Sequence, residues 1–174
     1  MKYTLRRFLL LLIIISIIFG IQYGGTILPK VLKPMFFSKE PRTLDGTPIS
    51  AYSEVSKAPI LFVIYWKASC SYCKQQLADM QKIYPKVKER YGELVDFVSV
   101  NIGDSENSVR GVVNKIGITF PVLIGFSEVP KVTSVPFSIL IIREQDTYKV
   151  LYEKVGAMNG EQILSLLEQF IQEK

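Results

Sequence analysis

The chain has 174 residues, of which 48% are hydrophobic, 21% are charged and 11% are aromatic. This composition excludes disordered, collagen-like and low-complexity chains, and the length allows one domain plus an appendage. Lys and Arg number 21 against 16 Asp and Glu. Five of the basic residues lie before residue 35, where no acidic residue occurs: Lys2, Arg6, Arg7, Lys30 and Lys33. The rest of the chain is therefore neutral, and we expect no nucleic-acid partner because phosphate binding needs a basic face.

The N-terminal segment predicts a membrane anchor. Residues 8–28 contain no charged side chain, and a helix needs about 20 such residues to cross a bilayer. Lys2, Arg6 and Arg7 precede this run, so the positive-inside rule predicts a cytoplasmic N-terminus and an exported remainder. A cleaved signal peptide is the alternative. We prefer the uncleaved anchor because no Ala-x-Ala-like site follows the apolar run.

Three regions follow from this pattern. Residues 1–28 are predicted to form the cytoplasmic N-terminus and the transmembrane anchor. Residues 29–41 are predicted to form a linker, because its prolines prevent a continuous helix. Residues 42–174 are predicted to form the globular domain.

Within the domain, the pattern of apolar residues predicts alternating strands and helices. An Asp45-Gly46 turn joins two short candidate strands at its start. The later elements are, in chain order, a strand at 60–65, a helix at 71–91, a strand at 94–100, a helix at 105–116, a strand at 120–124, a hairpin of strands at 137–142 and 148–155, and a helix that begins at Asn159. The first crossovers are parallel and the hairpin is antiparallel. We therefore predict an α/β fold, a central mixed β-sheet with helices on both faces, preceded by one N-terminal transmembrane helix.

The content of histidine and cysteine restricts the chemistry. The chain has no histidine and only two cysteines. The lack of histidine excludes Ser-His and Cys-His catalysis, haem ligation through His, and most zinc and copper sites. We expect neither a metal nor a cofactor, and any catalysis must depend mainly on the two sulfur atoms.

Those two residues, Cys70 and Cys73, lie three positions apart between a predicted buried strand and a predicted helix. At a helix N-terminus, unpaired N–H groups and the helix dipole favour the thiolate of Cys70. Cys73 lies one turn further on, close enough for a disulfide. A disulfide that only stabilises the fold is the alternative. Closing so short a loop removes little entropy from the unfolded chain, so such a bridge would stabilise the fold little. The arrangement favours thiol–disulfide exchange, in which Cys70 attacks a substrate disulfide and Cys73 resolves the mixed disulfide.

Residues 42–172 resemble the thioredoxin-like proteins, and in particular their membrane-anchored extracytoplasmic branch of TlpA and ResA type. The resemblance depends on Tyr65-Trp66 before the motif, on the cysteine pair followed by Lys74, and on Val135-Pro136. It implies that Pro136 is cis and faces the cysteines, and that the Val135 backbone binds an extended substrate. We assign Trp66, Tyr72, Val135 and Pro136 to substrate binding. For Trp66, support of the cysteine loop or core packing is the alternative.

The sequence departs from these relatives at three positions. Ser69 replaces the Trp that most of them carry directly before the first cysteine. Ile64 replaces the buried Asp of thioredoxin, and Gln76 replaces the Glu of ResA-like proteins. Both familiar carboxylates that could take the proton of Cys73 are therefore missing.

The leading functional hypothesis is an extracytoplasmic, membrane-tethered thiol–disulfide oxidoreductase that reduces disulfides of exported proteins, for example in cytochrome c maturation. Its partners would be those substrates and a membrane or extracytoplasmic thiol electron donor. An exported disulfide oxidant is one alternative, because Ser71-Tyr72 leaves the redox poise open. A non-catalytic thioredoxin-like binding module is the other.

Overall fold

The computed structural model describes residues 41–127, 129, 131–145 and 147–172. The predicted anchor and nearly all of the predicted linker lie outside the described residues. None of the helices in these ranges is both long enough and apolar enough to cross a membrane.

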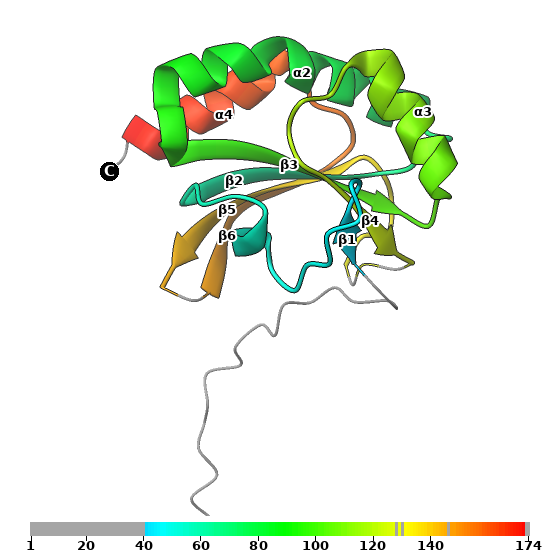
Figure 1. Ribbon diagram of the computed structural model, residues 1–174. Coiled ribbons are helices and arrows are strands. Elements are labelled where there is room, and N and C mark those ends of the chain that lie inside the picture. Colours follow the sequence, from blue (N-terminus) through cyan, green and yellow to red (C-terminus); the bar gives the residue numbers. More distant parts are fainter. Residues whose placement is uncertain (1–40, 128, 130, 146, 173–174) are drawn as a thin grey trace, which may run out of the picture. The chain divides into compact units, whose positions relative to one another are not determined.

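The domain is built on one six-stranded sheet with the strand order β1-β4-β3-β2-β5-β6 (Figure 1). The strands and helices are, in chain order, β1 (Arg42–Thr43), the 3₁₀ helix η1 (Tyr52–Glu54), β2 (Ile60–Trp66), α2 (Ser71–Tyr91), the 3₁₀ helix η2 (Gly92–Leu94), β3 (Val95–Ile102), α3 (Glu106–Ile116), β4 (Val122–Phe126), β5 (Phe137–Glu144), β6 (Thr147–Val155) and α4 (Gly160–Gln172).

The sheet is mixed, as predicted. β2 pairs in parallel with β3, and β3 pairs in parallel with β4. β5 lies antiparallel to β2 on its other side, and β6 completes an antiparallel hairpin with β5. The short strand β1 lies antiparallel to β4 at the opposite edge.

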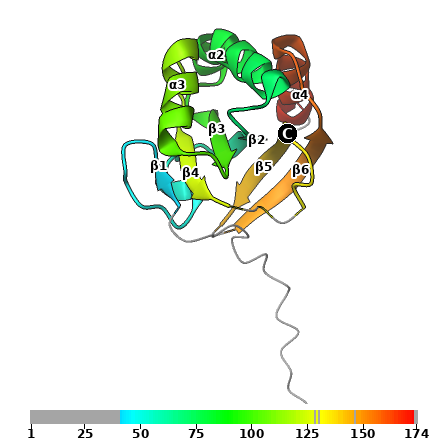
Figure 2. The ribbon, with the colours of Figure 1, turned by 90° about the vertical axis from the view of Figure 1, so that its right-hand side faces the viewer.

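The prediction of helices on both faces is wrong for the α-helices that the structure describes. Figures 1 and 2 show α2, α3 and α4 on the same side of the sheet. β2, β3 and β4 follow one another in a single direction across the sheet, and two successive right-handed crossovers in one direction place both connecting helices on one face. The other face is covered by the 3₁₀ helix η1 and by loop segments that contribute Ile49, Val129 and Val132.

Two apolar layers stabilise the domain, one on each face of the sheet. Because side chains alternate along a strand, Phe62, Ile64 and Trp66 of β2 face the helices, whereas Leu61 and Tyr65 face the loops. Because both faces of β2 are covered, both sets of alternating side chains are apolar, and the apolar run is continuous in the sequence. All seven residues of this central strand are buried.

Most predicted elements are present, with shifts at their ends. β4 is shifted by two residues at both ends. It begins at Val122 and not at residue 120, since Pro121 has no N–H to donate to a neighbouring strand. The predicted start of α4 is confirmed by a capping box. The Gln162 N–H donates to Asn159 Oδ1 (2.9 Å), and the Asn159 N–H donates to Gln162 Oε1 (3.0 Å).

Candidate functional site

Cys70 and Cys73 form a disulfide at the N-terminus of α2, with their Cα atoms 5.3 Å apart. Cys70 is the N-cap of the helix, and its Sγ accepts a hydrogen bond from the Cys73 N–H (3.1 Å). Cys70 is partly exposed, whereas Cys73 is fully buried. The predicted placement of one accessible and one shielded sulfur is therefore confirmed.

The local sequence explains this placement. The apolar strand β2 ends at Trp66, and residues 67–69 turn the chain into α2, with the Cys70 N–H donating to the Lys67 carbonyl (3.1 Å). The first turn of α2 contains no acidic residue. The helix dipole and the cap hydrogen bond therefore act on the Cys70 sulfur without a carboxylate in that turn to oppose them.

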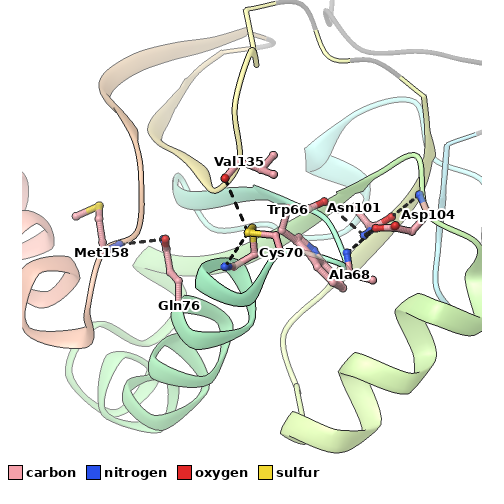
Figure 3. The surroundings of a disulfide bond; sticks show 9 residues. Trp66, Ala68, Cys70, Gln76, Asn101, Asp104, Val135 and Met158 are labelled. Atoms are coloured by element: carbon pink, nitrogen blue, oxygen red, sulfur yellow. Dashed lines mark hydrogen bonds between the residues drawn. A yellow bond between two sulfur atoms is a disulfide. The ribbon is translucent and has the colours of Figure 1, made fainter.

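The Val135–Pro136 peptide bond is cis and lies beside the disulfide, as the resemblance implied. Figure 3 shows the Val135 carbonyl oxygen pointing toward Cys70, and its distance from Cys70 Sγ is 3.8 Å. Pro136 is buried, and its carbonyl accepts a hydrogen bond from the Gly156 N–H (2.8 Å). Residues 65 positions apart in the chain thus form one face around the cysteines.

The two aromatic residues assigned to substrate binding have different environments. Tyr72, between the cysteines, is 67% exposed and lies where a partner could contact it. Trp66 is 0% exposed, so its assignment as a direct substrate contact is wrong. Its side chain is on the helix-facing side of β2, where the alternation of the strand directs it into the core beneath the cysteine loop.

Tyr65, the neighbour of Trp66, faces the opposite side of the sheet and takes no part in the cysteine chemistry. Its hydroxyl shares a hydrogen bond with the Tyr52 hydroxyl (2.8 Å). Burial, followed by the charge and hydrogen bond of Tyr52, raises the pKa of Tyr65 well above its usual value. The phenol therefore stays neutral.

Gln76 is buried one turn after Cys73 and connects three parts of the site. Its Nε2 donates to Ser138 Oγ in β5 (2.8 Å), and its Oε1 accepts from the Met158 N–H (3.1 Å), as Figure 3 shows for Met158. Ile64 is fully buried. At these two positions the site contains an amide and a hydrocarbon, and neither group can accept the proton of Cys73.

Two polar residues beside the site were not identified from the sequence: Asn101 and Asp104. Asp104 Oδ2 accepts a hydrogen bond from the Ala68 N–H (2.6 Å), and Asn101 Nδ2 donates to the Trp66 carbonyl (3.4 Å). A usable signal was present. Both residues follow the predicted strand at 94–100, although Asn101 is still part of β3, and the carboxyl ends of β2 and β3 meet at one edge of a parallel sheet.

A model of the AhpC/TSA family matches residues 33–129, which is more than half of the chain and includes both cysteines. The chain belongs to the AhpC/TSA family. Among curated relatives, the thiol-disulfide oxidoreductase ResA of Bacillus anthracis is 27% identical over 112 residues. ResA of Geobacillus kaustophilus is 26% identical over 112 residues. Each match covers 62% of this chain and 61% of the relative, so the chain spans less than two thirds of their length.

Solved structures establish a thioredoxin-like fold. StoA from Bacillus subtilis has a TM-score of 0.56 at 21% identity, over 75% of this chain and 96% of that chain. The thioredoxin-related protein from Neisseria meningitidis serogroup B has a TM-score of 0.60 at 19% identity, over 78% of this chain and all of the other. The predicted thioredoxin-like α/β fold with a mixed sheet is confirmed.

Proposed function

We propose that this family member is a thiol–disulfide oxidoreductase that reduces disulfides of exported proteins. The observation that carries the proposal is the asymmetric cysteine pair. A partly exposed Cys70 caps a helix opposite the cis Val135–Pro136 bond, and a fully buried Cys73 lies within disulfide distance. The similarity to ResA proteins supports the same activity.

The reaction proceeds by two exchanges. The Cys70 thiolate attacks one sulfur of the substrate disulfide, which forms a mixed disulfide and releases the other substrate sulfur as a thiolate. Cys73 then attacks Cys70 Sγ, and its proton passes to the released thiolate. The second substrate sulfur departs, the substrate has gained two electrons, and the protein carries the Cys70–Cys73 disulfide. An external dithiol must reduce this disulfide before the next turnover.

The backbone around Val135 is proposed to hold the substrate during the attack. Its carbonyl lies 3.8 Å from Cys70 Sγ, so an extended peptide that bonds to this backbone would present its own sulfur to Cys70. Tyr72, exposed between the cysteines, would contact the same peptide.

The proposed location is the outer face of the cytoplasmic membrane. The support is the uncharged run at residues 8–28 with Lys2, Arg6 and Arg7 before it. An exported apocytochrome c is the proposed substrate by family resemblance. A membrane or extracytoplasmic thiol protein is the proposed electron donor.

Insulin reduction in the presence of dithiothreitol tests the activity. The wild-type protein should accelerate the precipitation of insulin chains, and Cys70→Ser should abolish the acceleration. Cys73→Ser should accumulate mixed disulfides through Cys70, because the resolving thiol is lost. If neither the wild type nor Cys73→Ser exchanges with any disulfide, the protein is a binding module and the proposal fails.

The reduction potential of the cysteine pair tests the direction of electron flow. A value near that of thioredoxin, about −270 mV, supports a reductase. A value near about −120 mV would identify an exported oxidant and contradict the proposed direction.

A further inference from the structure

Residues 67–69 form the turn between β2 and α2, and a side chain from the segment that follows β3 bonds to this turn. These residues belong neither to the sheet nor to α2. The Ala68 N–H donates to Asp104 Oδ2 at 2.6 Å, and Figure 3 shows this bond on the side of the cysteine loop that faces α3. This charge-assisted bond lies two residues before the sulfur that attacks substrate.

Asn101 holds Asp104 in place. It is almost fully buried, and its Nδ2 donates both to Asp104 Oδ2 (2.8 Å) and to the Trp66 carbonyl (3.4 Å). Its Oδ1 accepts from the Asp104 N–H (3.3 Å). Trp66 and Asn101 are register partners in the parallel pair β2–β3. One amide therefore connects the end of β2, the end of β3 and the carboxylate.

The Asp104 carboxylate is also close enough to Cys70 for its charge to matter. Two residues span at most about 7 Å of chain. With the 2.6 Å bond to Ala68 and the length of the Cys70 side chain added, the Asp104 carboxylate lies within about 13 Å of Cys70 Sγ. This upper bound is about one and a half Debye lengths at physiological salt, so solvent ions screen the charge only in part. A negative charge there disfavours a thiolate on Cys70.

Few other charged or titratable groups surround Cys70. Its own segment has Lys67, Tyr72, Cys73 and Lys74, and the described part of the loop that leads to Val135 has Lys131. Residues 156–159, between β6 and α4, contain no titratable side chain. Asp104 is the carboxylate that the hydrogen bonds connect to the cysteine loop.

We propose that Asp104 is a positioning residue that fixes the cysteine turn through the Ala68 N–H and, by its charge, limits the thiolate population of Cys70. The inference deepens the proposed function, since it concerns the reactivity of the same sulfur. The positioning role of Asp104 and the effect of its charge can be separated by two substitutions. In Asp104→Asn the amide oxygen can accept both hydrogen bonds that Oδ2 accepts, whereas Asp104→Ala loses both hydrogen bonds and the charge.

The charge is tested by the rate of Cys70 alkylation with iodoacetamide between pH 4 and 10, in the reduced protein with Cys73→Ser as background. Asp104→Asn should lower the pH midpoint by about 0.3–1 unit, which makes alkylation about two- to tenfold faster at pH 6. The difference should shrink in 1 M KCl because salt screens the charge. Glu89→Gln is the matched control. Glu89 is exposed in the same helix, about 28 Å along its axis from Cys70, and its removal should leave the midpoint unchanged.

The positioning is tested by turnover. Asp104→Ala should lower kcat/KM for a disulfide substrate by about tenfold or more, and Asp104→Asn should retain it within about threefold. An unchanged alkylation midpoint in Asp104→Asn, or an equal shift in Glu89→Gln, would overturn the charge effect. Equal turnover in Asp104→Ala and the wild type would overturn the positioning role. The alkylation measurement needs no substrate, so its result is independent of whether the protein reduces insulin.

Discussion

At the scale of single residues, the cysteine pair combines two environments within one helical turn. Cys70 is the N-cap and is partly exposed, whereas Cys73 lies on the buried side of α2 beside Gln76. A thiol at a helix N-terminus has a lowered pKa, and a thiol in apolar surroundings has a raised pKa. Position along one helix therefore divides the roles of nucleophile and resolving thiol.

This division predicts the order of reaction in the reduced protein. Brief exposure to iodoacetamide at pH 7 should label Cys70 at least about tenfold more than Cys73, because only the thiolate reacts and only Cys70 is accessible. Peptide mass spectrometry after trypsin measures the two labels. As a control, both cysteines should be labelled in 6 M guanidinium chloride. Preferential labelling of Cys73 in the folded protein would reverse the assigned roles.

The missing carboxylate near Cys73 predicts a slow second exchange. Gln76→Glu places an acidic group three residues after Cys73 on the same helix face, where Ser138 and the Met158 N–H can still bond to it. A positioned base contributes about 100-fold or more in favourable cases. We therefore expect faster release from a Cys70 mixed disulfide, measured by stopped flow from pH 6 to 9.

Ser138→Ala is the matched control for that variant. It removes the hydrogen-bond partner of Gln76 Nε2 without adding an acid, so the release rate should not increase. If Gln76→Glu leaves the rate and its pH profile unchanged, another group already serves as the base.

At the scale of elements, the helix layer is closed by the approach of α4 to α2. A Cβ added at Gly160, the first residue of α4, would lie 2.8 Å from Ile83 Cγ2 in α2. Because a β-branched side chain has little freedom at χ1, Ile83 cannot move aside at low cost. A residue without a side chain is therefore required at this position.

Gly160→Ala should lower the free energy of unfolding by about 1–3 kcal/mol through this overpacking. Gly111 is the matched control, since it lies inside α3 and an added Cβ meets no atom within 4 Å. Gly111→Ala should raise the stability by about 0.5–1 kcal/mol. Urea unfolding measures both variants. Stabilisation by both substitutions would show that α4 can move away from α2.

At the scale of the whole molecule, the anchor hypothesis predicts that the cysteines face the outside of the cell. After reduction of intact cells with a membrane-impermeant phosphine, an impermeant maleimide should label the wild-type protein at Cys70. The Cys70→Ser variant controls for labelling elsewhere. Labelling only after lysis would place the domain in the cytoplasm and contradict the hypothesis.

The same labelled protein distinguishes an anchor from a cleaved signal peptide. An uncleaved anchor predicts that residues 8–28 remain in the labelled protein and that the protein stays in the membrane after carbonate extraction. Loss of roughly the first 28 residues and release from the membrane would support cleavage.

The sequence by itself determined the elements and the chemistry of this protein. The apolar run of β2, the helical spacing in α2 and the Asn159–Gln162 cap are local signals, since each depends on residues a few positions apart. The cysteine motif at the junction of β2 and α2 is local for the same reason. Its placement at a helix N-terminus could therefore be predicted without a structure.

Only the tertiary structure decided which distant segments meet. The strand order and the hand of the crossovers put α2 and α3 on one face, and α4 packs on the same face after β6. No periodicity within a helix encodes that choice. The alternation of side chains along β2 places Trp66 on the helix-facing side, where it is buried. Its position beside the cysteine motif had suggested a surface contact. The contact of Asp104 with the cysteine turn spans 36 positions. It exists because parallel strands end at the same edge of the sheet, a relation that appears only when the strands are paired.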